Sequence, residues 1–186
     1  MTKPEIRYLY ELKDVLYDQK WLEKAKNFEL YYIYRGIKEK NDLRYDITII
    51  PPKMLGQEFV KTKGHEHFGN YQELYQVLKG EALFLLQKRE GNLIKDVYAV
   101  KAKEKEGVII SPDYSHLIIN PSKKILKVGN WIAKKSKNDY SFFKKRQGAG
   151  YYLTKEGWLK NKNYKKIPKL RFEKSLKSLF KNCYYN

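Results

Sequence analysis

The chain of 186 residues has a single cysteine, Cys183, and no long apolar stretch. One thiol cannot form an internal disulfide framework, and this cysteine usage is typical of the reducing cytosol. No apolar run approaches the roughly 20 residues of a membrane-spanning helix, and residues 1–5 (MTKPE) lack the apolar core of a signal peptide. We therefore expect a soluble, cytoplasmic protein without a membrane partner.

Acidic residues are also in short supply, with 21 Asp and Glu against 39 Lys and Arg, a net charge of +18. Such a charge attracts polyanions and anionic metabolites. The basic residues are scattered until residues 155–186, which hold ten of them against two acids. No helix-turn-helix pattern and no aromatic-basic signature of an RNA-recognition sheet accompanies them. A lysine-rich, AT-biased genome accounts for most of these lysines, and a basic nucleic-acid-binding module stays an alternative function.

Histidine is equally scarce, and the three that are present have the spacing of metal ligands. His65 and His67 are two residues apart, so in a strand their rings point to the same face. Glu73 follows six residues later, and His116 lies in a second motif (PDYSH). Three imidazoles and one carboxylate suit iron(II), manganese(II), nickel(II) or zinc(II). We predict one such ion per chain, iron(II) first among them.

Most of the remaining sequence predicts short strands in a single all-β domain with short flanking helices. Residues 6–17 fit either a strand or a helix, and Asp18–Asn27 predicts a helix that Asp18 caps. Turn residues separate the strands, as expected of an antiparallel sandwich or barrel. The predicted strands are Glu29–Arg35, Tyr45–Ile50, Glu58–Thr62, Glu73–Leu78, Ala82–Gln87, Ile94–Val100, Val108–Ser111, Leu117–Ile119 and Ile125–Ile132.

The C-terminal stretch has a different pattern. Phe172, Leu176, Leu179 and Phe180 have helical spacing after Pro168, which predicts an amphipathic helix. An apolar stripe needs a protein surface to bury it, so we expect this helix to cover a barrel edge or a dimer seam. A nucleic-acid or membrane-surface patch is the alternative.

Two longer motifs carry a resemblance to a known family. Residues 62–67 (TKGHEH) and 73–80 (ELYQVLKG) precede Gly107 and residues 112–120 (PDYSHLIIN). In this order they resemble the two cupin motifs, and more narrowly the cupin-type glucose-6-phosphate isomerases of archaea, over roughly residues 31–140. The resemblance implies a cupin jelly-roll barrel (double-stranded β-helix) over residues 1–148, with an N-terminal extension. Residues 149–186 would form a basic C-terminal extension.

The resemblance also implies roles for individual residues. Tyr75 would point into the barrel beside the metal, Tyr140 would lie near the substrate, and the protein would be a homodimer. The metal ligands would be His65, His67, Glu73 and His116, and the positions that line the sugar-phosphate pocket would be Thr48, Thr62 and Gly64.

The implied activity interconverts glucose 6-phosphate and fructose 6-phosphate in glycolysis and gluconeogenesis. A metal with two free coordination positions would act as a Lewis acid on the substrate oxygens. Glu73 would carry the proton between the two carbons, unless a metal-assisted hydride shift replaces that step. The predicted catalytic residues are Glu73, Tyr75 and His116.

The chain departs from the family pattern at several positions. Asn138 stands where the family tends to place a histidine, Ile132 occupies a site often held by tyrosine, and the segment between His67 and Glu73 is one residue shorter. These departures leave other functions open. They are a metal-dependent cupin acting on another phosphorylated or nucleotide-linked sugar, an oxygen-using iron enzyme, or a non-catalytic cupin that senses a small anion.

Overall fold

Strands make up most of residues 3–177, the part of the chain that the computed structural model describes. No helix in this part is long and apolar enough to cross a membrane. The helices are the 3₁₀ helix η1 (Leu9–Val15), α1 (Gln19–Leu22) and α2 (Ser141–Lys145). The strands are β1 (Glu5–Tyr8), β2 (Glu29–Lys40), β3 (Leu43–Ile50), β4 (Met54–Leu55), β5 (Glu58–Phe59), β6 (Glu66–Phe68), β7 (Glu73–Lys79), β8 (Glu81–Glu90), β9 (Leu93–Lys103), β10 (Gly107–Ile110), β11 (Tyr114–Ile119), β12 (Leu126–Ala133), β13 (Lys137–Asp139), β14 (Tyr151–Thr154), β15 (Gly157–Lys160) and β16 (Arg171–Lys174).

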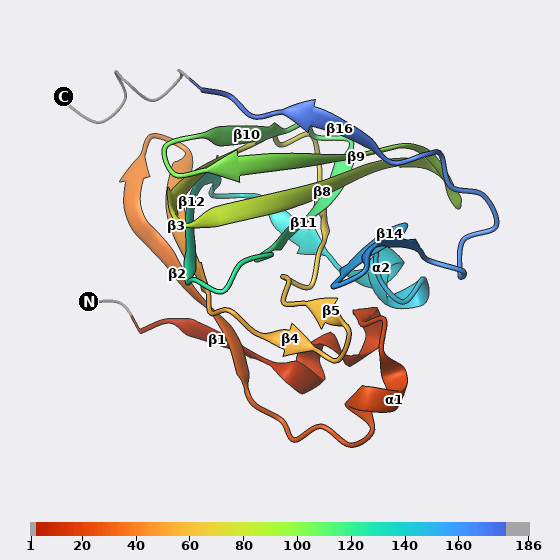
Figure 1. The fold of residues 1–186 in the computed structure, drawn as a ribbon. Coiled ribbons are helices and arrows are strands. Elements are labelled where there is room, and N and C mark those ends of the chain that lie inside the picture. Colours follow the sequence, from red (N-terminus) through yellow and green to blue (C-terminus); the bar gives the residue numbers. More distant parts are fainter. Residues whose placement is uncertain (1–2, 178–186) are drawn as a thin grey trace.

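Two large sheets form the barrel (Figure 1). The first has the order β1-β2-β3-β12-β7-β10 and the second β11-β8-β9-β16. From β7 onward the chain alternates between them: β8 and β9 belong to the second sheet, β10 to the first, β11 to the second and β12 to the first. Antiparallel strands that alternate between two sheets in this way form a jelly roll. The predicted all-β jelly-roll class with short flanking helices is therefore confirmed.

The core contains side chains from both sheets. Val77 and Val128 of the first sheet and Phe84 and Leu86 of the second are all fully buried. Alternate residues of each strand supply these side chains, as the period of a strand requires. Gly80 ends β7 in the left-handed conformation, with φ +84°, and a Cβ there would lie 2.8 Å from the Ile125 carbonyl oxygen. The turn after β7 therefore needs glycine.

The predicted strands all overlap observed ones, with one marked shortening. Of Glu58–Thr62, only Glu58–Phe59 is a strand, and Lys61 makes an isolated bridge to Ile119. Residues 6–17 contain both a strand and a helix, since β1 runs directly into η1. The predicted helix after Asp18 shrinks to the single turn of α1, although Asp18 does cap it by accepting a hydrogen bond from the Trp21 N–H at 3.0 Å.

A buried ion pair fastens the N-terminal segment to the barrel. The Lys61 side chain is only 2% exposed, and its ammonium binds the Glu58 carboxylate and donates to the Val15 carbonyl at 2.8 Å. The second oxygen of Glu58 accepts from the Tyr17 N–H at 3.0 Å. These bonds tie the end of η1 and the residues just after it to β5 and to the segment that leads from β5 to the histidine pair.

Up to residue 177, where the described part of the chain ends, the C-terminal stretch does not form the helix predicted after Pro168. Residues Arg171–Lys174 are strand β16, which pairs in parallel with β9, and Figure 1 shows the two side by side. Leu176 then bridges to Gly107 of β10. The helical spacing is overridden because the open edge of β9 offers unpaired backbone groups to this segment. The segment does cover a barrel edge, but as a strand; Leu179, Phe180 and Cys183 lie outside the described residues.

Residues just after position 148 pack on the barrel. Thr154 of β14 pairs with Glu58 of β5, and Tyr151 and Leu153 belong to the same core cluster as the two large sheets. The division into residues 1–148 and 149–186 remains a prediction.

Candidate metal centre

Two of the predicted ligands come from distant stretches of chain and meet as backbone partners. His65, just before β6, and His116 in β11 form an antiparallel bridge. The His65 N–H donates to the His116 carbonyl at 3.1 Å, and the His116 N–H donates back at 3.0 Å. The centroids of the two rings lie 4.5 Å apart. The fold itself therefore fixes the separation of these imidazoles.

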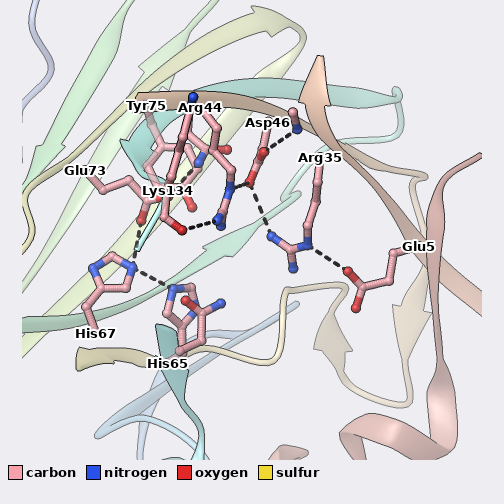
Figure 2. A network of polar contacts seen from close by, with 12 residues as sticks. Glu5, Arg35, Arg44, Asp46, His65, His67, Glu73, Tyr75 and Lys134 are labelled. Atoms are coloured by element: carbon pink, nitrogen blue, oxygen red, sulfur yellow. Dashed lines mark hydrogen bonds and ion pairs between the residues drawn. The ribbon is translucent and has the colours of Figure 1, made fainter. Parts of the chain in front are cut away.

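The other two predicted ligands complete the cluster. His67 Nε2 lies 3.1 Å from His65 Nε2, as the spacing of two residues along a strand allows. Glu73 begins β7 in the opposite sheet, and its Oε2 lies 3.3 Å from His67 Nε2 and 3.2 Å from His116 Nε2. Figure 2 shows the labelled His65, His67 and Glu73 side chains converging. The four residues predicted from the sequence are thus brought together.

The Glu73 carboxylate is held by one oxygen only. Its Oε1 accepts a hydrogen bond from Asn130 Nδ2 at 2.6 Å, and both side chains are buried. Its Oε2 is buried and accepts no hydrogen bond from any described residue, although two imidazole nitrogens lie close to it. Anchoring one oxygen of a carboxylate leaves the other directed at a fixed point, which is how partners of a metal ligand usually act.

Two members of the cluster, His65 and Glu73, have pKa values that favour the protonation states of metal ligands. Burial lowers the pKa of His65 well below its ordinary value, and the neighbouring His116 lowers it further. Burial acts against ionisation of Glu73, but contacts with His116 and His67 hold the pKa of its carboxyl below the ordinary value. Burial, and then the charge of Glu73, raise the pKa of Tyr75 well above its ordinary value. Neutral imidazoles and an ionised carboxylate are the forms that bind a cation.

The donor atoms fit a divalent ion. One ligand atom each from His65, His67 and Glu73 lies within 4.8 Å of the others, which identifies these three as a group that could hold a metal. His116 lies outside that group but its Nε2 adjoins Glu73 Oε2. The imidazole nitrogens close to Glu73 Oε2 do not hydrogen-bond to this buried oxygen. A bound cation would accept the lone pairs of the nitrogens and of the oxygen together. The set of imidazoles with one carboxylate suits iron(II), manganese(II), nickel(II) or zinc(II) alike.

The cluster lines a pocket that opens to solvent, with a cavity volume of about 50 Å³. All the site residues predicted from the sequence line it: Thr48, Thr62, Gly64, His65, His67, Glu73, Tyr75, His116 and Tyr140.

The polar residues around the cluster keep free hydrogen-bonding capacity. Thr62 Oγ1 accepts from the Ile118 N–H at 3.0 Å, so its hydroxyl hydrogen can be donated elsewhere. Tyr140 accepts from Asn138 Nδ2 at 3.2 Å and keeps its own hydrogen likewise.

Gly64 has φ +77°, and a Cβ there would meet Leu117 Cβ at 3.2 Å. The backbone can therefore follow this close path only with glycine.

One wall of the pocket was missed by the sequence reasoning. Arg35, Arg44 and Asp46 line it together, and the Asp46 carboxylate accepts from Arg44 Nε at 3.0 Å and from Arg35 Nη1 at 3.3 Å. Figure 2 shows this Arg–Asp–Arg network beside the histidines. Arg44, Asp46 and Thr48 are alternate residues of β3, so they share the face already predicted for Thr48. That alternation was the signal that could have found them.

Two further residues were also missed. Lys63 lines the pocket with its ammonium 5.4 Å from the centre of the Tyr140 ring, and burial lowers its pKa, as do Lys144 and Arg7 nearby. Asn130, the partner of Glu73, pairs with Tyr75 across β12 and β7. An asparagine in a strand carries no sequence signal of its own, because only the register shows what it faces.

Comparisons with known proteins point to one family. A family model described as glucose-6-phosphate isomerase (GPI) matches residues 7–169. A glucose-6-phosphate isomerase of Pyrococcus abyssi is 33% identical over 126 residues, which are 64% of this chain and 64% of that protein. One of Thermococcus litoralis is 30% identical over 130 residues, 66% of each chain. The chain thus spans slightly less than two thirds of the length of these curated relatives.

The similar solved structures are more distant. An oxalate oxidase in complex with the substrate analogue glycolate aligns with a TM-score of 0.45 and 16% identity, over 54% of this chain and 46% of that chain. A Cupin_2 domain of an XRE family transcriptional regulator from Enterobacter cloacae aligns with a TM-score of 0.40 and 16% identity, over 55% and 95%.

Proposed function

Because the chain belongs to the glucose-6-phosphate isomerase family, we propose that it interconverts glucose 6-phosphate and fructose 6-phosphate. We further propose that His65, His67, Glu73 and His116 hold one divalent cation for this reaction. The observation that carries the proposal is the meeting of three imidazoles and a carboxylate in one pocket, together with the threonines and tyrosines that the family resemblance implies. We expect iron(II) as the ion, a homodimer as the assembly and the cytoplasm as the location.

The cluster and Tyr75 supply the groups that this reaction needs. When bound, a divalent ion would supply Lewis-acid stabilisation of the negative charge that develops on the substrate oxygens. Glu73 is the carboxylate of the cluster, and in this proposal it carries the proton between C1 and C2 of the sugar. Its Oε1 stays on Asn130, so only Oε2 faces the pocket. Tyr75 remains protonated because burial raises its pKa, and it can donate its hydroxyl hydrogen to the same charge.

The phosphate needs cations and hydroxyl donors at the other end of the substrate. Thr62 and Thr48 offer hydroxyl groups, and Lys63 offers a half-buried ammonium. Three cationic side chains and two carboxylates line the pocket, which leaves the lining with a net charge of +1 before any ion binds. This charge favours an anionic sugar over a neutral one, and charge-assisted hydrogen bonds are the strong ones.

A coupled assay for fructose 6-phosphate formation tests the proposal directly. We expect turnover that a chelator abolishes and that added iron(II) or manganese(II) restores. His65→Ala and His116→Ala should lose bound metal and turnover together, whereas Asp113→Asn, which removes an exposed carboxylate, should change neither. Full turnover in both histidine variants, or no turnover by the metal-loaded protein, would refute the proposal.

A second candidate is an isomerase of another phosphorylated sugar. The charged wall of Arg35, Asp46 and Arg44 favours it, since these groups offer hydrogen bonds that can discriminate between the hydroxyl patterns of different sugars. A panel of phosphorylated aldoses and ketoses, compared by kcat/KM, decides between the two candidates.

A further inference from the structure

Glu66 lies between the two histidines of the pair and points the other way. Alternate residues of a strand face opposite sides, so the residue between His65 and His67 turns its side chain away from the pocket. There it meets Arg89 of β8: Arg89 Nε donates to Oε1 at 2.6 Å and Nη2 donates to Oε2 at 2.7 Å. A bidentate fork of this kind fixes direction as well as distance.

The Arg89 side chain is itself held from several sides. Its Nη1 donates to the Gly91 carbonyl at 2.9 Å, and its Cζ lies 4.5 Å from the centre of the Phe142 ring. Phe142 is buried on α2. The pairing of β8 with β9 shifts register between Lys88 and Arg89, and such bulges commonly re-aim a side chain. Arg89 is thus a rigid arm and not a mobile surface residue.

The histidine pair benefits from a fixed side chain of this kind because its own strand, β6, has few backbone hydrogen bonds to the rest of the barrel. β6 has three residues, and its sheet partner is the equally short β13. Phe68, which follows His67, is 58% exposed. His65 has two backbone hydrogen bonds to His116, whereas His67 relies on this small sheet. The fork from Glu66 to Arg89 gives the segment a second attachment next to His67.

The same strand also supports the third histidine. His116 pairs with Leu86 across β11 and β8, three residues before Arg89. β8 therefore holds His116 through its backbone and the His65–His67 segment through the side chain of Arg89. A single strand fixes all three imidazoles relative to one another.

We propose that Arg89 is a positioning residue for the metal site: through its fork to Glu66 it holds His65 and His67 at the spacing that captures the ion. The inference rests on the proposed function insofar as it requires a divalent ion at the cluster. It predicts that substitutions of Arg89 or Glu66, which would touch neither metal nor substrate, weaken metal binding. Residues that hydrogen-bond to metal ligands or hold them in place commonly have this effect.

The experiment measures cobalt(II) binding to the metal-free protein, by titration and by the visible absorption of the bound ion. Arg89→Lys keeps the charge and loses the fork, and Glu66→Gln keeps the shape and loses the charge. We expect each to raise the Kd about 10-fold and to change the cobalt spectrum. Arg171→Lys is the matched control, since Arg171 makes a similar fork to Asp96, at 3.0 and 2.6 Å, to hold β16. It should leave the Kd within about twofold.

The double variant of Arg89→Lys and Glu66→Gln separates positioning from general damage. If the fork is one unit, the double variant should bind cobalt no more weakly than either single variant. A Kd and a spectrum unchanged in both single variants, with wild type binding tightly, would overturn the role of Arg89 and leave the proposed function standing. A wild-type protein that binds no divalent ion would overturn both.

Discussion

The hydrogen bond from Asn130 to Glu73 is a sensitive point at which to perturb the site. Asn130→Leu keeps nearly the same volume in β12 and removes the Nδ2 donor that lies 2.6 Å from Glu73 Oε1. Both side chains are buried, so no water replaces the lost bond readily. The change leaves a buried carboxylate oxygen without its partner.

The expected size of the effect follows from that loss. Hydrogen bonds to charged groups contribute about 1.5–3 kcal/mol, and an unsatisfied buried group costs a similar amount. We therefore expect the free energy of unfolding of the metal-free variant to fall by about 2 kcal/mol. Because Oε2 loses its fixed direction, metal affinity should fall by about 10- to 100-fold.

Urea unfolding in chelator and metal titration of the folded protein measure the two effects separately. Asn120→Leu is the control, since Asn120 is equally buried but donates to the Ile50 and Lys124 carbonyls. It should lower the free energy of unfolding and leave the metal Kd unchanged. An Asn130→Leu variant with wild-type metal affinity would show that Glu73 does not need this bond, and would refute the reasoning.

Three further predictions concern stability. Lys61→Met leaves the buried Glu58 carboxylate without its cation, and urea unfolding should show a free energy of unfolding lower by about 3–5 kcal/mol. A double variant with Glu58→Gln should recover part of this loss. Full stability of the single variant would contradict the role of the ion pair. Deleting residues 171–186 should expose the β9 edge and promote aggregation, seen by light scattering, while turnover persists; a soluble, monodisperse truncation would contradict this. Burial raises the pKa of Tyr164 to about 12, so the unfolded state ionises first and stability falls as the pH rises from about 10 to about 12. The urea midpoint measures this fall, and Tyr164→Phe should make it shallower.

Local periodicity was enough to predict the barrel strands and to single out His65 and His67 as candidate metal ligands. The histidine pair follows from a spacing of two residues, and β7 follows from a strand-like run that ends at the turn of Lys79 and Gly80. The meeting of His65 with His116 is a pairing between distant segments, which only the two-motif resemblance could anticipate.

The failures have one physical cause, namely that tertiary pairing decides what local pattern leaves open. Phe172 and Leu176 have helical spacing, yet the free edge of β9 draws this segment into a parallel strand. Arg44 and Asp46 share the face of Thr48 by alternation, but only the register of β3 shows that this face borders the pocket. Arg89 was missed because the direction of its side chain depends on a shift in strand register that the local sequence does not reveal.

The parallel pairing of β16 with β9 has a consequence for biosynthesis. A ribosome makes β9 long before it reaches residue 171, so the nascent barrel emerges with the backbone groups along one side of β9 uncovered. During that interval another nascent chain can dock there in place of β16, as exposed strand edges permit. β16 thus covers the edge of β9 only after residues 104–170 have been made. Slow translation of those residues would lengthen the time during which another chain can pair with β9.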